Sequence, residues 1–77
     1  MKAIVWSKIN CPYCVMAISL LKNKNYEIEE RKIGVDWTKD QLLESVPTAR
    51  TVPQIFLDSE YIGGYDNLVK HFENKSV

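Results

Sequence analysis

Hydrophobic and polar positions in the first half of the chain follow two periods, and each period predicts a different element. Lys2–Trp6 is a short apolar run with β-branched residues, which is typical of a buried strand. From Cys14 to Asn23 apolar side chains recur three and four apart, which predicts a helix with a broad apolar face. Tyr26–Ile33 predicts a second strand, with three acidic residues on its solvated side: Glu27, Glu29 and Glu30.

The second half of the chain opens with a helix start signal. Thr38 and Gln41 have the spacing of a capping box, in which a hydroxyl at the cap is followed three residues later by an amide. The helix is expected to run through Val46 and to end before Pro47, because the residue before a proline disfavours helical geometry. Two short strands joined by a turn are predicted next, with strand residues 54–57, turn residues 58–59 and strand residues 61–62.

Gly63-Gly64 then interrupts the pattern, and a last helix is expected to begin with Asp66 or its neighbour as cap. The predicted order is β-α-β-α-β-β-α. Strands joined through a helix pair in parallel with a right-handed crossover, and the last two strands should form an antiparallel hairpin on the same sheet. We therefore predict an α/β fold for one domain over residues 1–77, with a mixed four-stranded sheet flanked by three helices.

Composition narrows the class of function. The chain has 77 residues, of which 45% are hydrophobic, enough for one core. Ten basic and ten acidic side chains cancel, so no basic face for nucleic acid is expected. No apolar run approaches the roughly 20 residues of a membrane span. The apolar stretch within residues 1–6 is too short for a secretory signal and is soon followed by polar residues. We therefore expect a cytoplasmic protein without membrane or nucleic-acid partners.

The two cysteines of the chain stand three positions apart, in the run C-P-Y-C at residues 11–14. Such a pair can close a small disulfide ring and so carry two electrons without a cofactor. It lies between a predicted strand and a predicted helix, the context in which a C-x-x-C pair indicates a redox site. A structural disulfide is disfavoured, because the ring is small and the expected compartment is reducing.

Three motifs occur in order along this frame: C-P-Y-C at residues 11–14, T-V-P at residues 51–53 and G-G-Y-D at residues 63–66. Together they resemble a dithiol glutaredoxin of the short bacterial or bacteriophage type, in the thioredoxin-like superfamily. The resemblance covers the chain from the first strand to Phe72. It implies a thioredoxin-like fold and a glutathione-dependent thiol–disulfide oxidoreductase, with glutathione as co-substrate.

The two cysteines are expected to have different roles. Cys11 precedes the first helix, where N–H groups and the helix dipole favour negative charge, and Lys8 adds a cation three residues upstream. We therefore expect a lowered Cys11 pKa and an exposed, attacking thiolate. Cys14 lies one turn further on and should be the more buried, resolving thiol. Pro12 suits an early helix position, where its missing N–H costs nothing.

The resemblance also implies glutathione contacts around the cysteines. Lys8, otherwise a surface lysine, would contact a carboxylate of glutathione, and Tyr13, otherwise a half-buried aromatic, would form a wall of the groove. A proline at the start of a strand is tolerated structurally. The resemblance implies more at Pro53, namely a cis peptide that turns the Val52 backbone toward the cysteine portion of glutathione, as in strand addition. Two flanking residues complete this side: Thr51 as a contact and Arg50 as a weaker one.

The third motif is expected to hold the γ-glutamyl end of glutathione. Gly64 allows close approach of the backbone, and the helix start beyond it offers N–H groups to an anion. Asp66 matches the family's acid for the γ-glutamyl ammonium, and it could equally cap the helix. Tyr65 occupies a position where many relatives carry cysteine or another small residue. The residue type at this position therefore departs from the family pattern, and the resemblance does not settle its contact with glutathione. Asn67 is interpreted either as a ligand donor or as a cap.

The resulting hypothesis is a monomer that reduces protein–glutathione mixed disulfides and protein disulfides, with ribonucleotide reductase as a possible partner. An alternative is a hydrogen donor fed by thioredoxin reductase. Another is an iron–sulfur module in which Cys11-type thiolates and glutathione hold a cluster between two subunits, although Pro12 is more usual in relatives that are enzymes. No metal is expected otherwise, because His71 and two cysteines do not complete a four-ligand zinc set.

Overall fold

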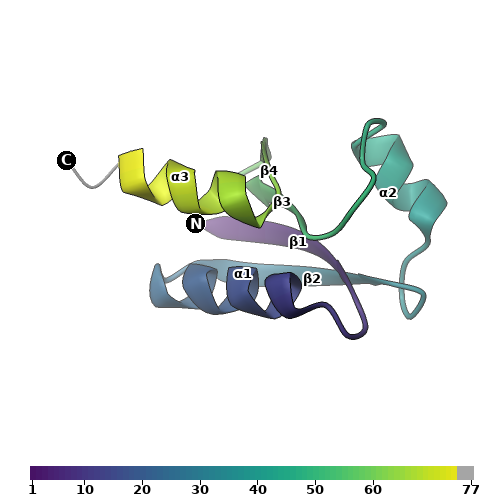
Figure 1. The fold of residues 1–77 in the computed structure, drawn as a ribbon, viewed down its shortest axis with the longest axis horizontal. Helices are drawn as coiled ribbons and strands as arrows, with labels where there is room; N and C mark the ends of the chain where they lie inside the picture. Colours follow the sequence, from purple (N-terminus) through teal and green to yellow (C-terminus); the bar gives the residue numbers. More distant parts are fainter. Residues whose placement is uncertain (75–77) are drawn as a thin grey trace.

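The computed structural model describes residues 1–74, and these residues form seven elements in the predicted order (Figure 1). No helix among them is long and apolar enough to cross a membrane. The elements are β1 (Lys2–Lys8), α1 (Pro12–Asn23), β2 (Glu27–Ile33), α2 (Lys39–Ser45), β3 (Gln54–Leu57), β4 (Glu60–Gly63) and α3 (Tyr65–Asn74).

The described strands form one mixed sheet in the order β2-β1-β3-β4. β1 pairs in parallel with β2, from Lys2 opposite Glu27 to Lys8 opposite Ile33. β1 pairs antiparallel with β3, which pairs antiparallel with β4. α1 supplies the crossover that a parallel pair requires, while a tight turn at Asp58-Ser59 joins the last two strands. The predicted fold class is confirmed.

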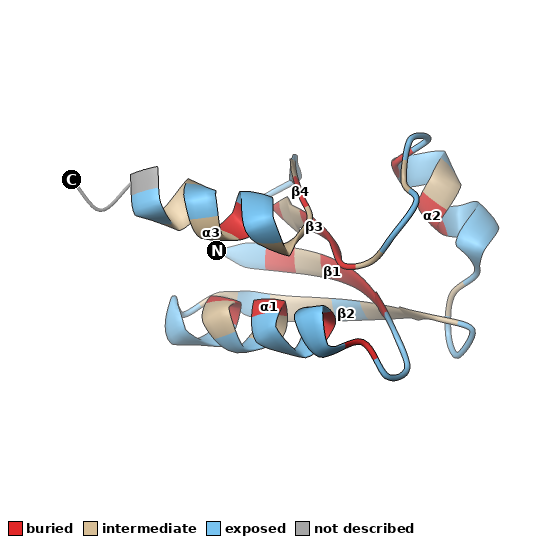
Figure 2. Cartoon of the chain, in the orientation of Figure 1, coloured by how far each residue is buried: buried red, intermediate tan, exposed pale blue. Residues whose placement is uncertain are grey.

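One face of the sheet carries the larger core. Ala3 and Val5 of β1 point to this face, where α1 and α3 cover them and contact each other. Leu21 of α1 and Leu68 of α3 are fully buried there, and burying each leucine stabilises the fold by about 1.5–3 kcal/mol. Figure 2 shows that both helices carry buried positions, in red, among exposed ones. This core holds both helices against β1.

The other face of the sheet is packed around tryptophan. Trp6 alternates with Val5 along β1 and is buried with Leu42 and Val46 near the short helix α2. Its ring meets Trp37 edge to face at 5.2 Å between centroids. The Arg31 guanidinium carbon lies 5.1 Å from the Trp6 ring centroid and 4.3 Å from that of Trp37. Both tryptophans are therefore packing residues.

Several element boundaries differ from the predicted ones. β1 continues two residues further, to Lys8, because Ser7 is buried and pairs with Lys32 of β2. α1 begins at Pro12, as expected from the position of Cys11 before the helix, although the apolar periodicity itself starts only at Cys14. The prediction that Asp66 or its neighbour caps the last helix is wrong, because α3 begins at Tyr65 and Asp66 lies within its first turn. Nor do the acidic residues of β2 share one solvated side, since neighbouring strand positions point to opposite faces.

Candidate redox site

The two cysteines form a disulfide at the start of α1, with their Cα atoms 5.2 Å apart. Cys11 is the N-cap of the helix, and its Sγ accepts a hydrogen bond from the Cys14 backbone N–H at 3.2 Å. Pro12 fills the first helical position, where no N–H is required. The helix therefore directs an N–H donor at the sulfur expected to attack, and this geometry favours a thiolate there.

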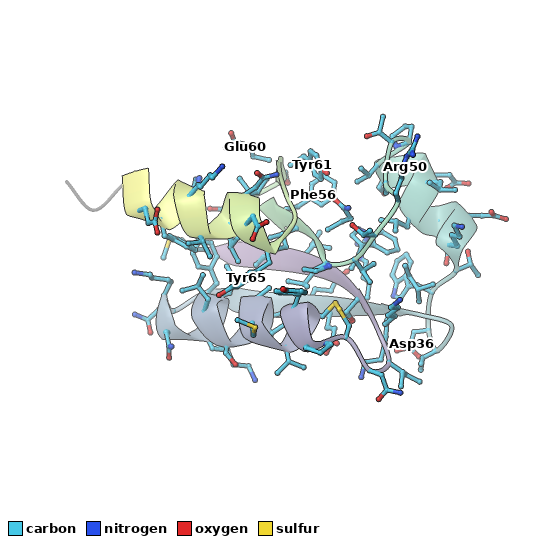
Figure 3. The ribbon with its side chains drawn as sticks, in the orientation of Figure 1. Asp36, Arg50, Phe56, Glu60, Tyr61 and Tyr65 are labelled. Carbon is cyan, nitrogen blue, oxygen red and sulfur yellow. A yellow bond between two sulfur atoms is a disulfide. The ribbon has the colours of Figure 1, made fainter. Side chains whose placement is uncertain are left out.

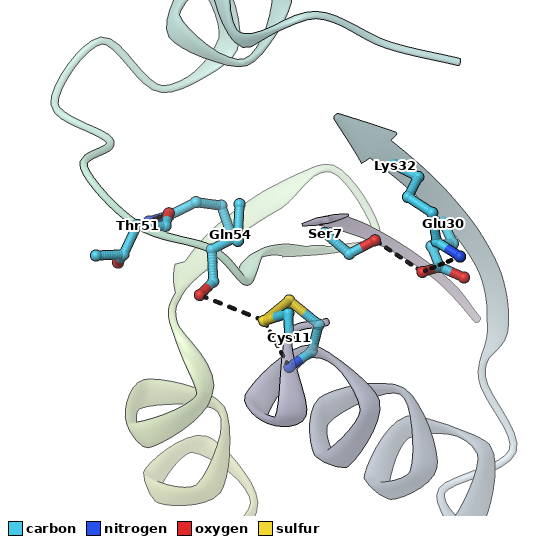
Figure 4. The surroundings of a disulfide bond; sticks show 8 residues. Ser7, Cys11, Glu30, Lys32, Thr51 and Gln54 are labelled. Carbon is cyan, nitrogen blue, oxygen red and sulfur yellow. Dashed lines mark hydrogen bonds and ion pairs between the residues drawn. A yellow bond between two sulfur atoms is a disulfide. The ribbon is translucent and has the colours of Figure 1, made fainter. Parts of the chain in front are cut away.

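Both cysteines are buried in the disulfide form, and for Cys11 this differs from the sequence prediction. Cys14 is 2% exposed, as expected for the inner residue, but Cys11 is only 8% exposed. The expectation of an exposed Cys11 is therefore wrong for the disulfide form. The reason is that the Val52 carbonyl oxygen lies 3.8 Å from Cys11 Sγ and closes one side of the ring (Figure 4). Tyr13, between the cysteines, is instead well exposed.

The loop that faces Cys11 carries the predicted cis peptide, between Val52 and Pro53. A pair of hydrogen bonds missed by the sequence analysis holds this loop. The side chain of Gln54 donates to the Thr51 carbonyl at 2.8 Å and accepts from the Tyr61 hydroxyl at 2.6 Å. Gln54 is buried at the start of β3, so it connects the loop to the sheet. An isolated glutamine in an apolar strand is the signal that could have indicated this role.

A groove of about 490 Å³ runs beside the Val52-Pro53 peptide. Its walls include the two tyrosines Tyr13 and Tyr65, whose ring centroids are 5.9 Å apart. Figure 3 shows Tyr65 between α3 and α1. The groove thus brings together the predicted glutathione contacts except Lys8 and Arg50, and it includes Asn67, which the sequence left as either a ligand donor or a cap. The lining residues are Tyr13, Thr51, Val52, Pro53, Gly64, Tyr65, Asp66 and Asn67.

Lys8 lies outside this groove. It lines a smaller pocket of about 210 Å³ together with Arg50 and Lys39. Thr51 and Val52 line both spaces, so the smaller pocket adjoins the groove. The smaller pocket is lined by these three cationic side chains and by apolar residues, so it extends the groove with a positively charged region.

Close packing shapes the α3 end of the groove. Gly64 accepts the first helical hydrogen bond, from the Leu68 N–H at 3.0 Å, and Asp66 is exposed in the first turn. Gly63 has a φ of +116°, and the Asn67 side chain lies over its Cα. Asn67 is therefore held against β4 as well as facing the groove.

A second groove, of about 490 Å³, lies on another side of the disulfide and was missed by the sequence analysis. Both cysteines line it, together with Glu30 and Lys32 of β2. Glu30 accepts a hydrogen bond from the buried Ser7 hydroxyl at 2.7 Å (Figure 4). Among residues 1–74, no cluster of three or more His, Cys, Asp or Glu side chains forms a candidate metal site.

The fold and the disulfide at the N-terminus of α1 define a small thioredoxin-like redox protein. Comparison with known proteins supports this class. A family model described as Glutaredoxin matches residues 3–62. The chain is 38% identical to Glutaredoxin 3 of Escherichia coli over 83% of this chain and 77% of that protein. It is 37% identical to Glutaredoxin 1 of Rickettsia conorii over 84% of this chain and 66% of that protein.

Solved structures agree as well. Reduced Escherichia coli glutaredoxin is similar with a TM-score of 0.79 and 31% identity, covering 96% of this chain and 95% of that one. A buckwheat glutaredoxin–glutathione complex is similar with a TM-score of 0.71 and 26% identity, covering 95% and 69%. This chain belongs to the glutaredoxin family. It spans about two thirds of the length of the Rickettsia relative, and 56% of Glutaredoxin-C4 of Arabidopsis thaliana.

Proposed function

We propose that this protein is a glutathione-dependent thiol–disulfide oxidoreductase that acts on glutathionylated proteins and protein disulfides. The observation that carries the proposal is the groove beside Val52-Pro53, which has room for a short peptide. Its lining includes Tyr13, from between the two cysteines, and Asp66, from the first turn of α3. A similar solved glutaredoxin is a complex with glutathione, which supports the same ligand here.

Each part of glutathione has a partner of suitable chemistry in this proposal. The Val52 backbone pairs with the cysteinyl residue in the manner of strand addition. Asp66 attracts the γ-glutamyl ammonium, and the free N–H groups at the start of α3 attract its carboxylate. Lys8 and Arg50, which line the adjoining pocket, attract the carboxylate at the other end of the tripeptide.

The reaction of a glutathionylated protein needs Cys11 alone. Its thiolate attacks the glutathione sulfur, the sulfur–sulfur bond to the protein breaks, and the protein leaves as a thiolate that takes up a proton. A second glutathione then attacks the glutathione sulfur bound to Cys11, which releases oxidised glutathione and restores the Cys11 thiolate. The Cys14 N–H that donates to Cys11 Sγ stabilises this thiolate at both stages.

A protein disulfide requires both cysteines. Cys11 forms a mixed disulfide with the substrate, and Cys14 then attacks Cys11 Sγ, releases the substrate thiol and leaves the disulfide seen in the structure. Two molecules of glutathione reduce that disulfide. The proposed reductant places the activity in a glutathione-containing compartment such as the cytoplasm.

Cysteine-to-serine variants test this assignment in an NADPH-coupled assay with glutathione reductase. One substrate is a glutathionylated peptide, and the other is a protein disulfide such as that of ribonucleotide reductase. Cys14→Ser should keep the first activity and lose most of the second, whereas Cys11→Ser should lose both. Substantial turnover by Cys11→Ser would refute its role as nucleophile. Reduction by thioredoxin reductase, but not by glutathione, would refute the choice of reductant.

A further inference from the structure

The second groove is lined both by the disulfide and by a carboxylate. It is formed by the end of β1, the start of α1 and the side of β2, and it is lined by Cys11, Cys14 and Glu30. The charged side chains that face this space are Lys8 from β1 and Glu30 and Lys32 from β2, while α1 contributes none. Of these three charged side chains, Glu30 is the one that carries a carboxylate and can accept a proton.

The Glu30 carboxylate is held in place on its buried side. The Ser7 hydroxyl, in a fully buried residue, donates to Glu30 Oε2 at 2.7 Å. The Lys32 ammonium lies 3.9 Å from the same oxygen. The Glu30 side chain nevertheless remains 37% exposed, so it also meets solvent. The Glu30 carboxylate thus contacts a buried hydroxyl on one side and solvent on the other.

Cys14 needs such a group because its own surroundings do not favour a thiolate. It is 2% exposed, and burial favours the neutral form of a thiol. The helix N–H at this position is directed at Cys11 Sγ. Within residues 1–74 no hydrogen-bond donor reaches Cys14 Sγ. The thiol must therefore lose its proton as it attacks, and the proton must pass to a nearby acceptor.

We propose that Glu30 accepts the proton of Cys14 during the resolving step, directly or through water in the second groove, and that Ser7 orients it. The inference rests on the proposed function, since it assigns a role within the two-cysteine route. The Cys14 sulfur forms a bond to Cys11 Sγ, and the bond from Cys11 to the substrate sulfur breaks. The electron pair leaves on the substrate thiolate, and the Cys14 proton moves to Glu30 and then to solvent or to that thiolate.

This role is selective, because Cys14 reacts only when a mixed disulfide on Cys11 must be resolved. Loss of the Glu30 carboxylate should slow that step and leave the attack of Cys11 on a disulfide unchanged. A purely structural role for Glu30 would instead disturb both steps, because both cysteines line the same groove.

The test follows the reduced protein after mixing with bis(2-hydroxyethyl) disulfide. Acid quenching and mass measurement separate the mixed disulfide on Cys11 from the internal disulfide. In Glu30→Gln the mixed disulfide should accumulate, because its resolution is slowed about tenfold or more near neutral pH. The deficit should shrink at alkaline pH, where Cys14 loses its proton to solvent. Glu30→Asp, which keeps a carboxylate, should recover part of the rate.

Glu27→Gln is the matched control, because it makes the same charge change at an exposed position of β2. Ser7→Ala should give a smaller slowing than Glu30→Gln, with circular dichroism used to confirm the fold of each variant. Equal resolution rates for Glu30→Gln and Glu27→Gln across pH would overturn the proposal, as would equal slowing of both steps in Glu30→Gln. The probe contains no glutathione, so this result is independent of whether glutathione is the physiological reductant.

Discussion

Replacing Gly63 with alanine tests how closely β4 and α3 pack beside the groove that is proposed to bind glutathione. The residue has a φ of +116°, a backbone conformation that side-chain-bearing residues rarely adopt. An added Cβ would also lie 2.3 Å from Asn67 Nδ2, and 3.2 Å and 3.3 Å from the Asn67 Cγ and Cβ. Both the backbone and the Asn67 side chain must therefore change to accommodate it.

The two costs can be estimated separately. Backbone strain of this kind costs about 1–3 kcal/mol. Forcing Asn67 from its rotamer adds about 0.5–1.5 kcal/mol. Gly63→Ala should thus lower the free energy of unfolding by about 1.5–4.5 kcal/mol. Each kcal/mol lowers the Tm by roughly 4–8 °C in a chain of this size. Because Asn67 lines the groove, the KM for glutathione should rise as well.

Two other glycines serve as controls in urea unfolding. Gly34 has a φ of +87° and open space around an added Cβ, so Gly34→Ala should show the strain alone. At Gly64 an added Cβ would lie 3.6 Å from the Pro53 carbonyl oxygen, an ordinary contact, and Gly64→Ala should change stability little. Adding Asn67→Ala to Gly63→Ala should recover part of the loss. The packing argument fails if Gly63→Ala costs no more than Gly34→Ala and Asn67→Ala recovers nothing.

Two further predictions concern side-chain hydrogen bonds. Gln54→Met removes the side-chain hydrogen bonds to Thr51 and Tyr61 and should lower the free energy of unfolding in urea by about 1–3 kcal/mol. Amide hydrogen exchange should also become faster in the loop at residues 51–53. Unchanged exchange would contradict the role given to Gln54. The pKa of the Glu29 carboxyl is lowered, mainly by its hydrogen bond with Arg31. The ionised Glu29 side chain therefore stabilises the fold above the unfolded-state pKa, and this stabilisation is lost as the pH falls through the folded-state pKa. The Tm of the wild type should therefore fall more steeply on acidification than that of Glu29→Gln, and parallel curves would refute this.

Local signals in the sequence were sufficient for most of the elements. The capping box at Thr38 and Gln41 is present, with the Gln41 N–H donating to Thr38 Oγ1 and the Thr38 N–H donating to Gln41 Oε1. Such signals succeed because their partners lie within one turn of the chain. The end of β1 was missed for the opposite reason. Ser7 is polar, and only its pairing with β2 and its bond to Glu30 make it a buried strand residue.

The candidate site divides in the same way. The C-P-Y-C run, the start of α1 and the order of the strands along the chain follow from residue type and spacing, because they depend on local backbone preferences. The meeting of residues 51–53 and 64–67 with residues 11–14 depends on β3 lying beside β1 in the sheet, which the chain order leaves open. The approach of Glu30 to the disulfide depends on the parallel register of β1 and β2. Side chains alternate between faces along a strand, so a shift of one residue would turn Glu30 to the other face of the sheet. Sequence therefore determined the chemistry available to this protein, and tertiary pairing decided which groups share the space around Cys11 and Cys14.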